Sequence, residues 1–184
     1  MQRRHLYIAW ALLGIAVIGM VFAWGRLHNT ASLHAPTLAE QLKPVKLRGP
    51  APDFSASTIG GAKLANSDLT GKPTVLDFFA SWCGPCKAEA AGLARLAQSY
   101  GDRVRFVGVD IGDTSKPTAR AFLRKYGWKF PVIWDPNQHL INPFTVDGQP
   151  TMILIDRRGN LALKVPGQHS MAEYRTAIDK LEAG

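Results

Sequence analysis

The only two cysteines of this 184-residue chain are separated by two residues, in the segment Cys83-Gly84-Pro85-Cys86. Two thiols at this spacing can close a disulfide with little rearrangement where a strand gives way to a helix. The N-terminal end of a helix also stabilises a thiolate, because its free N–H groups and its dipole favour negative charge. The sequence therefore predicts a redox-active dithiol, with Cys83 at the helix start and Cys86 a turn inside.

Three other uses of these thiols are open at this stage. A disulfide that only stabilises the fold is disfavoured by the short loop and the adjacent Trp82. A zinc site would need two more ligands, and His139 and His169 are isolated rather than paired at ligand spacing. A Cu(I) carrier remains an alternative, because thiolates suit that ion. We expect no metal and no cofactor other than the Cys83–Cys86 disulfide itself.

The segment before the cysteines has to hold them at a strand-to-helix turn. Residues 74–80 are largely apolar, as expected of a central strand that is covered on both faces. Asp77 lies in this run, where burial would raise the pKa of its carboxyl group and let it accept the Cys86 proton. The alternative is a solvent-facing Asp77 at a strand edge.

The rest of the chain alternates between strand and helix patterns. We expect a hairpin start near Gly60-Gly61, strands at 104–109, 130–134, 152–155 and 161–165, and helices over about 88–100, 116–126 and 170–182. Ser115 and Gly127 bound the middle helix, and Ser170 with Glu173 forms a capping box for the last one. Residues 137–146 have no clear pattern. This order predicts an α/β domain with a mixed central sheet and helices on both faces.

The N-terminus has the pattern of a membrane anchor. Residues 6–24 contain no charge, and at 1.5 Å per residue this run approaches the ~30 Å hydrocarbon core of a bilayer. Arg3 and Arg4 before it favour an N-terminus in the cytoplasm. A cleaved signal peptide is the competing interpretation. The predicted organisation is an anchor at 1–24, a linker at 25–50 and a folded domain at 51–184.

The basic composition does not indicate a nucleic-acid-binding protein. The formal net charge is +8, but no run of Lys and Arg is longer than two residues. Charges scattered in this way are typical of a solvated surface rather than of a stripe that follows phosphates.

The segment from Asp77 to Lys87, which contains Trp82-Cys83-Gly84-Pro85-Cys86, together with the distant Gln149-Pro150-Thr151, resembles the thioredoxin fold family. The anchor and the Ala51-Pro52-Asp53-Phe54 lead-in are similar to its extracytoplasmic branch of TlpA/ResA/CcmG-type thiol-disulfide oxidoreductases. The resemblance covers about residues 50–183. It implies a thioredoxin fold with an N-terminal transmembrane helix.

The resemblance also implies roles for particular residues. Cys83 would attack a substrate disulfide and Cys86 would resolve the mixed disulfide. Pro150 would be a cis-proline opposite the disulfide, and it would present the backbone of Gln149 to a substrate strand. The residues assigned to substrate contact are Trp82, Gly84, Pro85, Gln149 and Pro150. Asp113 falls where ResA-like members carry a functional acid, whereas Lys87 and Glu89 would equally suit an exposed helix surface.

By this resemblance the protein is a membrane-tethered dithiol reductant of protein disulfides. The implied location is a bacterial inner membrane, with the N-terminus in the cytoplasm and the catalytic domain in the periplasm. An oxidising compartment requires a DsbD- or CcdA-like membrane electron donor. Apocytochrome c thiols are a candidate substrate. A thiol peroxidase shares the Pro52-Asp53-Phe54 opening and is the main enzymatic alternative, although its usual Thr-x-x-Cys and arginine pattern is not evident around Cys83.

Overall fold

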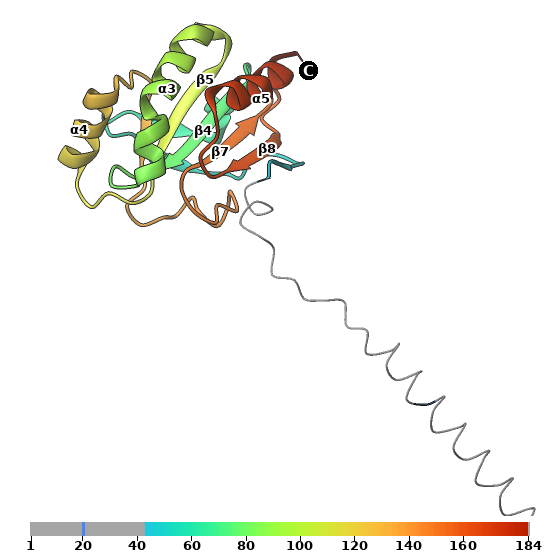
Figure 1. The fold of residues 1–184 in the computed structure, drawn as a ribbon, viewed down its shortest axis with the longest axis horizontal. Helices are drawn as coiled ribbons and strands as arrows, with labels where there is room; N and C mark the ends of the chain where they lie inside the picture. Colours follow the sequence, from blue (N-terminus) through green and yellow to red (C-terminus); the bar gives the residue numbers. More distant parts are fainter. Residues whose placement is uncertain (1–19, 21–42, 184) are drawn as a thin grey trace, which may run out of the picture. The chain divides into compact units, whose positions relative to one another are not determined.

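The computed structural model describes Met20 and residues 43–183, and its centre is a six-stranded mixed sheet in the order β1-β8-β7-β4-β5-β6 (Figure 1). The strands of this sheet are β1 Val45–Lys46, β4 Thr74–Phe79, β5 Arg105–Asp110, β6 Val132–Trp134, β7 Thr151–Ile155 and β8 Leu161–Pro166. The other elements are the hairpin β2 Ser55–Ser57 and β3 Lys63–Ala65, the 3₁₀ helices η1 Asn66–Leu69 and η2 Gly101–Arg103, and the helices α3 Gly84–Tyr100, α4 Lys116–Tyr126 and α5 Met171–Ala183.

Strand β4 is the central strand, as the sequence predicted. It pairs in parallel with β5 and antiparallel with β7, and all six of its residues are buried. Val75 and Phe79 belong to one hydrophobic cluster, while Leu76 and Phe78 belong to a second one on the other face. A strand covered on both faces has to be apolar at successive positions, which explains the run seen in the sequence.

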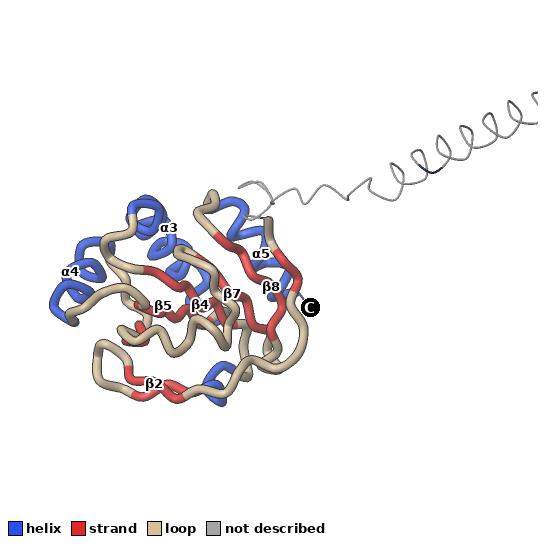
Figure 2. Tube along the Cα trace, turned by 90° about the horizontal axis from the view of Figure 1, so that it is seen from below, coloured by secondary structure: helices blue, strands red, loops and turns tan. Residues whose placement is uncertain are grey.

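The expectation of helices on both faces of the sheet was wrong for the described α-helices. Leu93 of α3, Phe122 of α4 and Ile178 of α5 share the hydrophobic cluster that contains Phe79, so these helices lie on one face (Figure 2). Strands β4, β5 and β6 are parallel and step across the sheet in one direction. Right-handed crossovers between such strands place both connecting helices, α3 and α4, on the same side.

Irregular structure covers the opposite face. Leu64 of β3, Leu69 of η1 and Phe144 pack there against Phe78 and its neighbours. Phe144 belongs to residues 137–146, which the sequence pattern left unassigned and which form turns in the structure. Apolar side chains from these turns and short elements therefore cover this face of the sheet, as the helices cover the other face.

The helix ends were predicted correctly from local sequence. The Ser115 hydroxyl group accepts a hydrogen bond from the Thr118 N–H, and α4 ends at Gly127 in the left-handed conformation. The Ser170 N–H donates to the Glu173 carboxylate, and the Glu173 N–H donates to the Ser170 hydroxyl group, so the capping box is present.

Part of the predicted linker pairs with the central sheet. Val45 and Lys46 pair with β8, the Leu47 N–H donates to the Ala162 carbonyl oxygen, and Pro50 forms a bridge with Asn160. These residues were assigned to the linker because they have no apolar period. They add a strand to what would otherwise be the open edge of β8.

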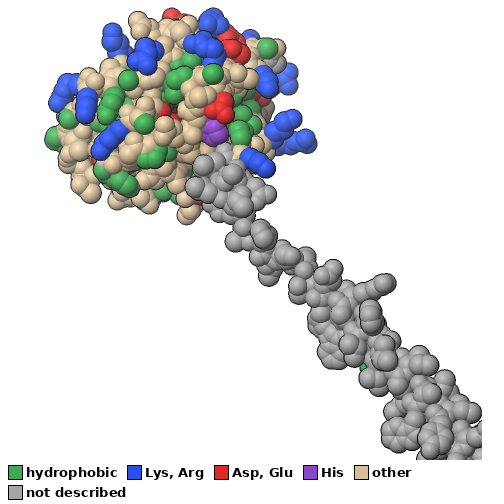
Figure 3. All heavy atoms as spheres, viewed as in Figure 1, with side chains coloured by type: hydrophobic (Ala, Val, Ile, Leu, Met, Phe, Trp, Pro, Cys, Tyr) green, Lys and Arg blue, Asp and Glu red, His purple; other side chains and the backbone are tan. Residues whose placement is uncertain are grey.

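The predicted anchor at 6–24 lies outside the described residues, apart from Met20. Within the part of the chain that the structure describes, no helix is both long enough and apolar enough to cross a membrane. On the face of the domain drawn in Figure 3, the Lys and Arg side chains are dispersed rather than gathered into one stripe.

Candidate active site

The two cysteines form a disulfide at the N-terminal end of α3. Cys83 is the N-cap residue, and its sulfur accepts a hydrogen bond from the Cys86 N–H at 3.2 Å. Cys83 is 5% exposed and Cys86 is 2% exposed. In the reduced protein the same N–H group and the helix dipole would stabilise a thiolate on Cys83, which is the chemistry that its place in the sequence predicted.

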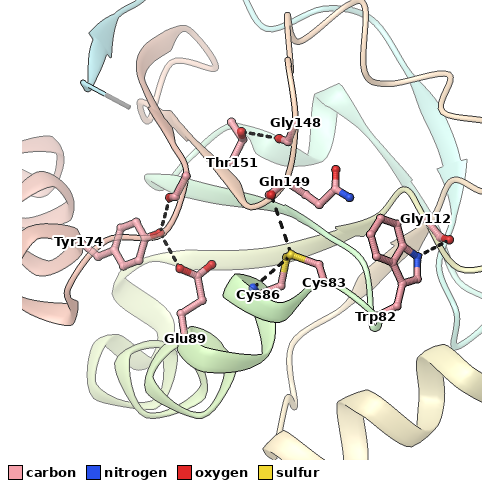
Figure 4. The surroundings of a disulfide bond; sticks show 10 residues. Trp82, Cys83, Cys86, Glu89, Gly112, Gly148, Gln149, Thr151 and Tyr174 are labelled. Carbon is pink, nitrogen blue, oxygen red and sulfur yellow. Dashed lines mark hydrogen bonds between the residues drawn. A yellow bond between two sulfur atoms is a disulfide. The ribbon is translucent and has the colours of Figure 1, made fainter. Parts of the chain in front are cut away.

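A cis-proline segment faces the disulfide. The Gln149–Pro150 peptide bond is cis, as expected, and the Gln149 carbonyl oxygen lies 3.9 Å from the Cys83 sulfur (Figure 4). The Thr151 hydroxyl group donates to the Gly148 carbonyl oxygen at 2.7 Å, which closes the turn before β7. The backbone beside the sulfur is therefore held where an extended substrate segment could pair with it.

Trp82 forms an exposed apolar surface next to the disulfide. Its side chain is 59% exposed, and its Nε1–H donates to the Gly112 carbonyl oxygen at 2.9 Å (Figure 4). A Cβ atom at Gly112 would lie 2.6 Å from the Ala80 Cβ and 3.1 Å from the indole ring, so only glycine fits under this tryptophan. An indole that is both exposed and fixed in place is suited to contact a partner protein.

Asp77 is buried on β4, so it is not a solvent-facing residue at a strand edge. Its side chain is 3% exposed, and within the described chain neither carboxyl oxygen has a hydrogen-bond partner. Burial raises the pKa of Asp77 from 3.8 to about 7. Near neutral pH this carboxyl group can therefore both take and release a proton.

Glu89 is a second buried carboxyl group, and the sequence analysis did not place it in the site. It is 3% exposed, and its Oε2 atom accepts a hydrogen bond from the Tyr174 hydroxyl group at 2.8 Å (Figure 4). Burial, together with repulsion from Asp77, raises the pKa of Glu89 to about 9. The spacing of Glu89 was the sequence signal that could have placed it in the site. A side chain three residues after Cys86 lies on the same buried face of the helix as Cys86. Lys87, by contrast, is exposed.

Asp113 is buried and directly follows Gly112, the residue whose carbonyl oxygen accepts the hydrogen bond from Trp82. It is 3% exposed, and it accepts a hydrogen bond from the Ser81 hydroxyl group at 2.6 Å. Its N–H donates to Oδ1 of Asp110 at 3.1 Å. Burial and the nearby Asp113 raise the pKa of Asp110 to about 7. The hydrogen bonds of Asp113 thus connect it to the loop that supports Trp82.

This arrangement supports thiol-disulfide exchange. The disulfide lies at a helix N-terminus, with a cis-proline backbone beside its outer sulfur. A buried carboxyl group of raised pKa, Glu89, lies one helical turn from the inner sulfur and interacts with Asp77. These groups provide a nucleophile, a docking edge and a proton acceptor. Among the described residues, no group of three or more His, Cys, Asp or Glu side chains is placed to hold a metal ion. The fold and the site together define a thiol-disulfide oxidoreductase with a thioredoxin fold.

Comparison with known proteins places the chain in a family. The model of the AhpC/TSA family matches residues 47–164, and the chain belongs to this family. Thiol-disulfide oxidoreductase ResA of Bacillus thuringiensis is 30% identical over 132 residues, which are 71% of this chain and 76% of the relative. The ResA protein of Bacillus subtilis is 27% identical over 184 residues, which are 100% of this chain and 97% of the relative.

Solved structures agree with this assignment. A secreted disulfide oxidoreductase of Mycobacterium tuberculosis, described as homologous to DsbE of E. coli, is 28% identical, with a TM-score of 0.64 over 70% of this chain and 96% of that one. The MTB dsbF protein, solved in mixed oxidized and reduced forms, is 35% identical, with a TM-score of 0.65 over 70% of this chain and 94% of that one. The enzyme is thus of the ResA/DsbE type.

Proposed function

We propose that this enzyme is a dithiol reductant of protein disulfides outside the cytoplasm, tethered to the bacterial inner membrane by residues 6–24. The observation that carries the reductant assignment is the pair of buried carboxyl groups, Asp77 and Glu89, which repel each other, with Glu89 one helical turn from Cys86. A resolving thiol that is 2% exposed cannot pass its proton directly to bulk water, so a nearby carboxylate has to accept it.

The reaction starts from the reduced protein. The Cys83 thiolate attacks one sulfur of the substrate disulfide, and the other substrate sulfur leaves as a thiolate. Cys86 then gives its proton to the carboxyl pair, and its thiolate attacks the Cys83 sulfur. The Cys83–Cys86 bond forms, the bond to the substrate breaks, and the second substrate sulfur leaves as a thiolate. The substrate gains two electrons and the protein loses two.

The proposal includes partners on both sides of this reaction. Trp82 and the Gln149-Pro150 backbone would contact the substrate protein, and apocytochrome c is a candidate because the chain is similar to ResA proteins. A reductant in an oxidising compartment has to be reduced again, so we infer a DsbD- or CcdA-like electron donor in the membrane. The N-terminus would then be cytoplasmic and the catalytic domain periplasmic.

A trapping experiment tests the proposed function. The Cys86→Ala variant, expressed as the full chain in its own membrane, should accumulate mixed disulfides on Cys83, because the resolving thiol is missing. Cys83→Ala is the matched control and should trap no partner. Recovery of apocytochrome c would support a role in haem attachment, and a range of unrelated envelope proteins would indicate a general reductase. Adducts with cytoplasmic proteins alone, or no adducts, would contradict the proposal.

Two simple assays separate this function from its alternatives. The reduced protein should reduce insulin disulfides. Consumption of peroxide at the expense of a thiol donor, without insulin reduction, would instead identify a thiol peroxidase. Tight retention of Cu(I) by Cys83 and Cys86, again without insulin reduction, would identify a copper carrier.

A further inference from the structure

Tyr174 of α5 lies next to Glu89 and is 1% exposed. Its hydroxyl group lies 2.8 Å from Oε2 of Glu89 (Figure 4) and 3.2 Å from the Gly167 carbonyl oxygen. It accepts a hydrogen bond from the His169 N–H at 3.3 Å. The titratable groups that face it are Glu89 from α3, Asp77 from β4 and His169 from the segment before α5. Glu173 lies beyond His169, 3.7 Å from its ring.

The tyrosine hydroxyl group has one proton and two nearby acceptors. It can donate fully to Oε2 of Glu89 or to the Gly167 carbonyl oxygen, but not to both. An ionised carboxylate is the stronger acceptor, so the proton goes to Glu89 when that group is charged. When Glu89 is neutral, its carboxyl group and the Gly167 carbonyl oxygen are acceptors of more similar strength for the tyrosine proton. The hydroxyl group therefore responds to the protonation state of Glu89.

Gly167 connects this hydroxyl group to the substrate side of the disulfide. The Gly167 N–H donates to the Pro150 carbonyl oxygen at 2.7 Å, and the carbonyl oxygen of the preceding Gln149 lies 3.9 Å from the Cys83 sulfur. On the other side, Glu89 is one helical turn from Cys86. Contacts made through Tyr174 thus join the environment of the inner sulfur to the cis-proline segment beside the outer one.

We propose that Tyr174 is a positioning residue for the thiol chemistry. Its hydroxyl group donates to Oε2 of the charged Glu89 and leaves Oε1 as the oxygen that takes or returns a proton beside Cys86. When Glu89 is neutral, the same hydroxyl group can donate instead to the carbonyl oxygen of Gly167, the residue hydrogen-bonded to Pro150. Oε1 has no hydrogen-bond partner in the described structure, and it points away from Tyr174 toward the disulfide (Figure 4). This inference rests on the proposed role of the carboxyl pair as the proton acceptor for Cys86.

The step affected is closure of the disulfide. The S–H bond of Cys86 breaks, its proton passes to the carboxyl pair, and the sulfur electron pair forms the bond to Cys83. The substrate sulfur leaves with the electrons of the broken mixed disulfide. The hydrogen bond from Tyr174 stabilises the Glu89 carboxylate and therefore lowers the pKa of Glu89. The carboxyl pair can then accept a proton at a pH closer to neutral.

The test measures closure as a function of pH in the full-length protein. A mixed disulfide between Cys83 and glutathione is prepared at low pH, and closure is followed after a jump to higher pH. Tyr174→Phe should move the midpoint of the rate profile upward by about one pH unit, which is about a tenfold loss of rate below the midpoint. Tyr100→Phe is the matched control, because Tyr100 is also buried and also donates to a carboxylate, that of Asp179 on α5. Its midpoint should not move.

The outcomes separate this inference from the proposed function. If Asp77→Asn and Glu89→Gln change the profile but Tyr174→Phe does not, the role of Tyr174 is overturned and the carboxyl mechanism stands. If none of the three changes it, both fail. Should Tyr174→Phe not fold, 3-fluorotyrosine at position 174 keeps the ring and makes the hydroxyl group a stronger donor. That replacement should move the midpoint to lower pH, and an unchanged midpoint would overturn the inference.

Discussion

Two carboxyl groups in apolar surroundings define the site at the scale of single residues. Asp77 has no hydrogen-bond partner in the described structure, and Glu89 accepts only from neutral donors, the Tyr174 hydroxyl group and the His169 N–H. Neutral hydrogen bonds do not offset the loss of water around a charge here, because burial is the largest cause of both raised pKa values, so both groups favour their protonated forms. Buried Asp and Glu side chains are usually paired with a positive charge. Buried carboxyl groups without such a partner are typical of a site that transfers protons.

The raised pKa of Glu89 predicts how stability depends on pH. The folded protein holds this proton up to a pKa of about 9, whereas the unfolded chain loses it near 4.5. Its contribution to stability is therefore complete below the unfolded value and is lost as the pH rises between the two values. The slope from one such group is at most about 1.4 kcal/mol per pH unit. Glu89→Gln should remove this component in urea unfolding of the oxidised protein at several pH values.

The control for this measurement is Glu182→Gln. Glu182 lies on the surface of α5 and pairs with Arg103. Its substitution should leave the slope unchanged. A Glu89→Gln protein whose slope equals that of the unsubstituted protein would contradict the assignment of a raised pKa to this residue.

The arrangement of elements follows from strand direction. Because β4, β5 and β6 are parallel and sequential across the sheet, α3 and α4 fall on one face, and α5 joins them from the end of the chain. The other face is covered by the β2–β3 hairpin, η1 and the segment after β6. That segment includes Gln138 and Thr145, whose φ angles of 60° and 52° lie in the left-handed region. No helical or strand period can run through such turns, which is why the pattern of residues 137–146 was ambiguous.

Packing between elements predicts a sensitive position in β5. A Cβ atom at Gly108 would lie 2.9 Å from Trp128, 3.1 Å from Val132 and 3.2 Å from Phe79. All three neighbours are buried, so Gly108→Ala should lower the free energy of unfolding by about 1–3 kcal/mol. Gly60→Ala is the control, because its Cβ atom would meet no atom nearer than 3.8 Å. Equal stability of the two variants in urea unfolding would contradict this packing argument.

At the scale of the whole molecule, the site joins segments that are far apart in the chain. The Gln149 carbonyl oxygen meets a sulfur 66 residues before it, and Tyr174 meets a carboxyl group 85 residues before it. The central sheet brings β4 and β7 together, so the ends of these strands carry the disulfide and the cis-proline to one edge. The residues of the site named above all belong to the described residues 43–183, and the proposed tether precedes them.

The proposed tether predicts where the full chain is found. The intact protein should sediment with membranes and resist release by high salt, because a retained apolar span is held by burial of its side chains rather than by charge. A variant that begins after residue 24 should be released into the soluble fraction and still reduce insulin. Recovery of the intact chain in the soluble fraction, shortened by about the length of the apolar run, would instead show a cleaved signal peptide.

Much of the fold and part of the site could be predicted from local sequence. The strand before Cys83, the helix that begins there, the caps at Ser115 and Ser170, and the cysteine pair itself depend on residues within one or two turns of each other. Their physics is that of short-range hydrogen bonds and side-chain period, which a sequence shows directly. The cis-proline at Pro150 came from resemblance to a known family rather than from such a pattern.

The tertiary structure decided what depends on burial and on distant partners. Glu89 looks like many exposed helix residues until α5 brings Tyr174 over it and β4 places Asp77 near it. Burial then changes an ordinary carboxyl group into one that keeps its proton at neutral pH. The sequence alone determined that this chain carries a dithiol at a helix start. Only the packed structure decided which groups exchange protons with it, because the energy of a charge depends on everything that replaces water around it.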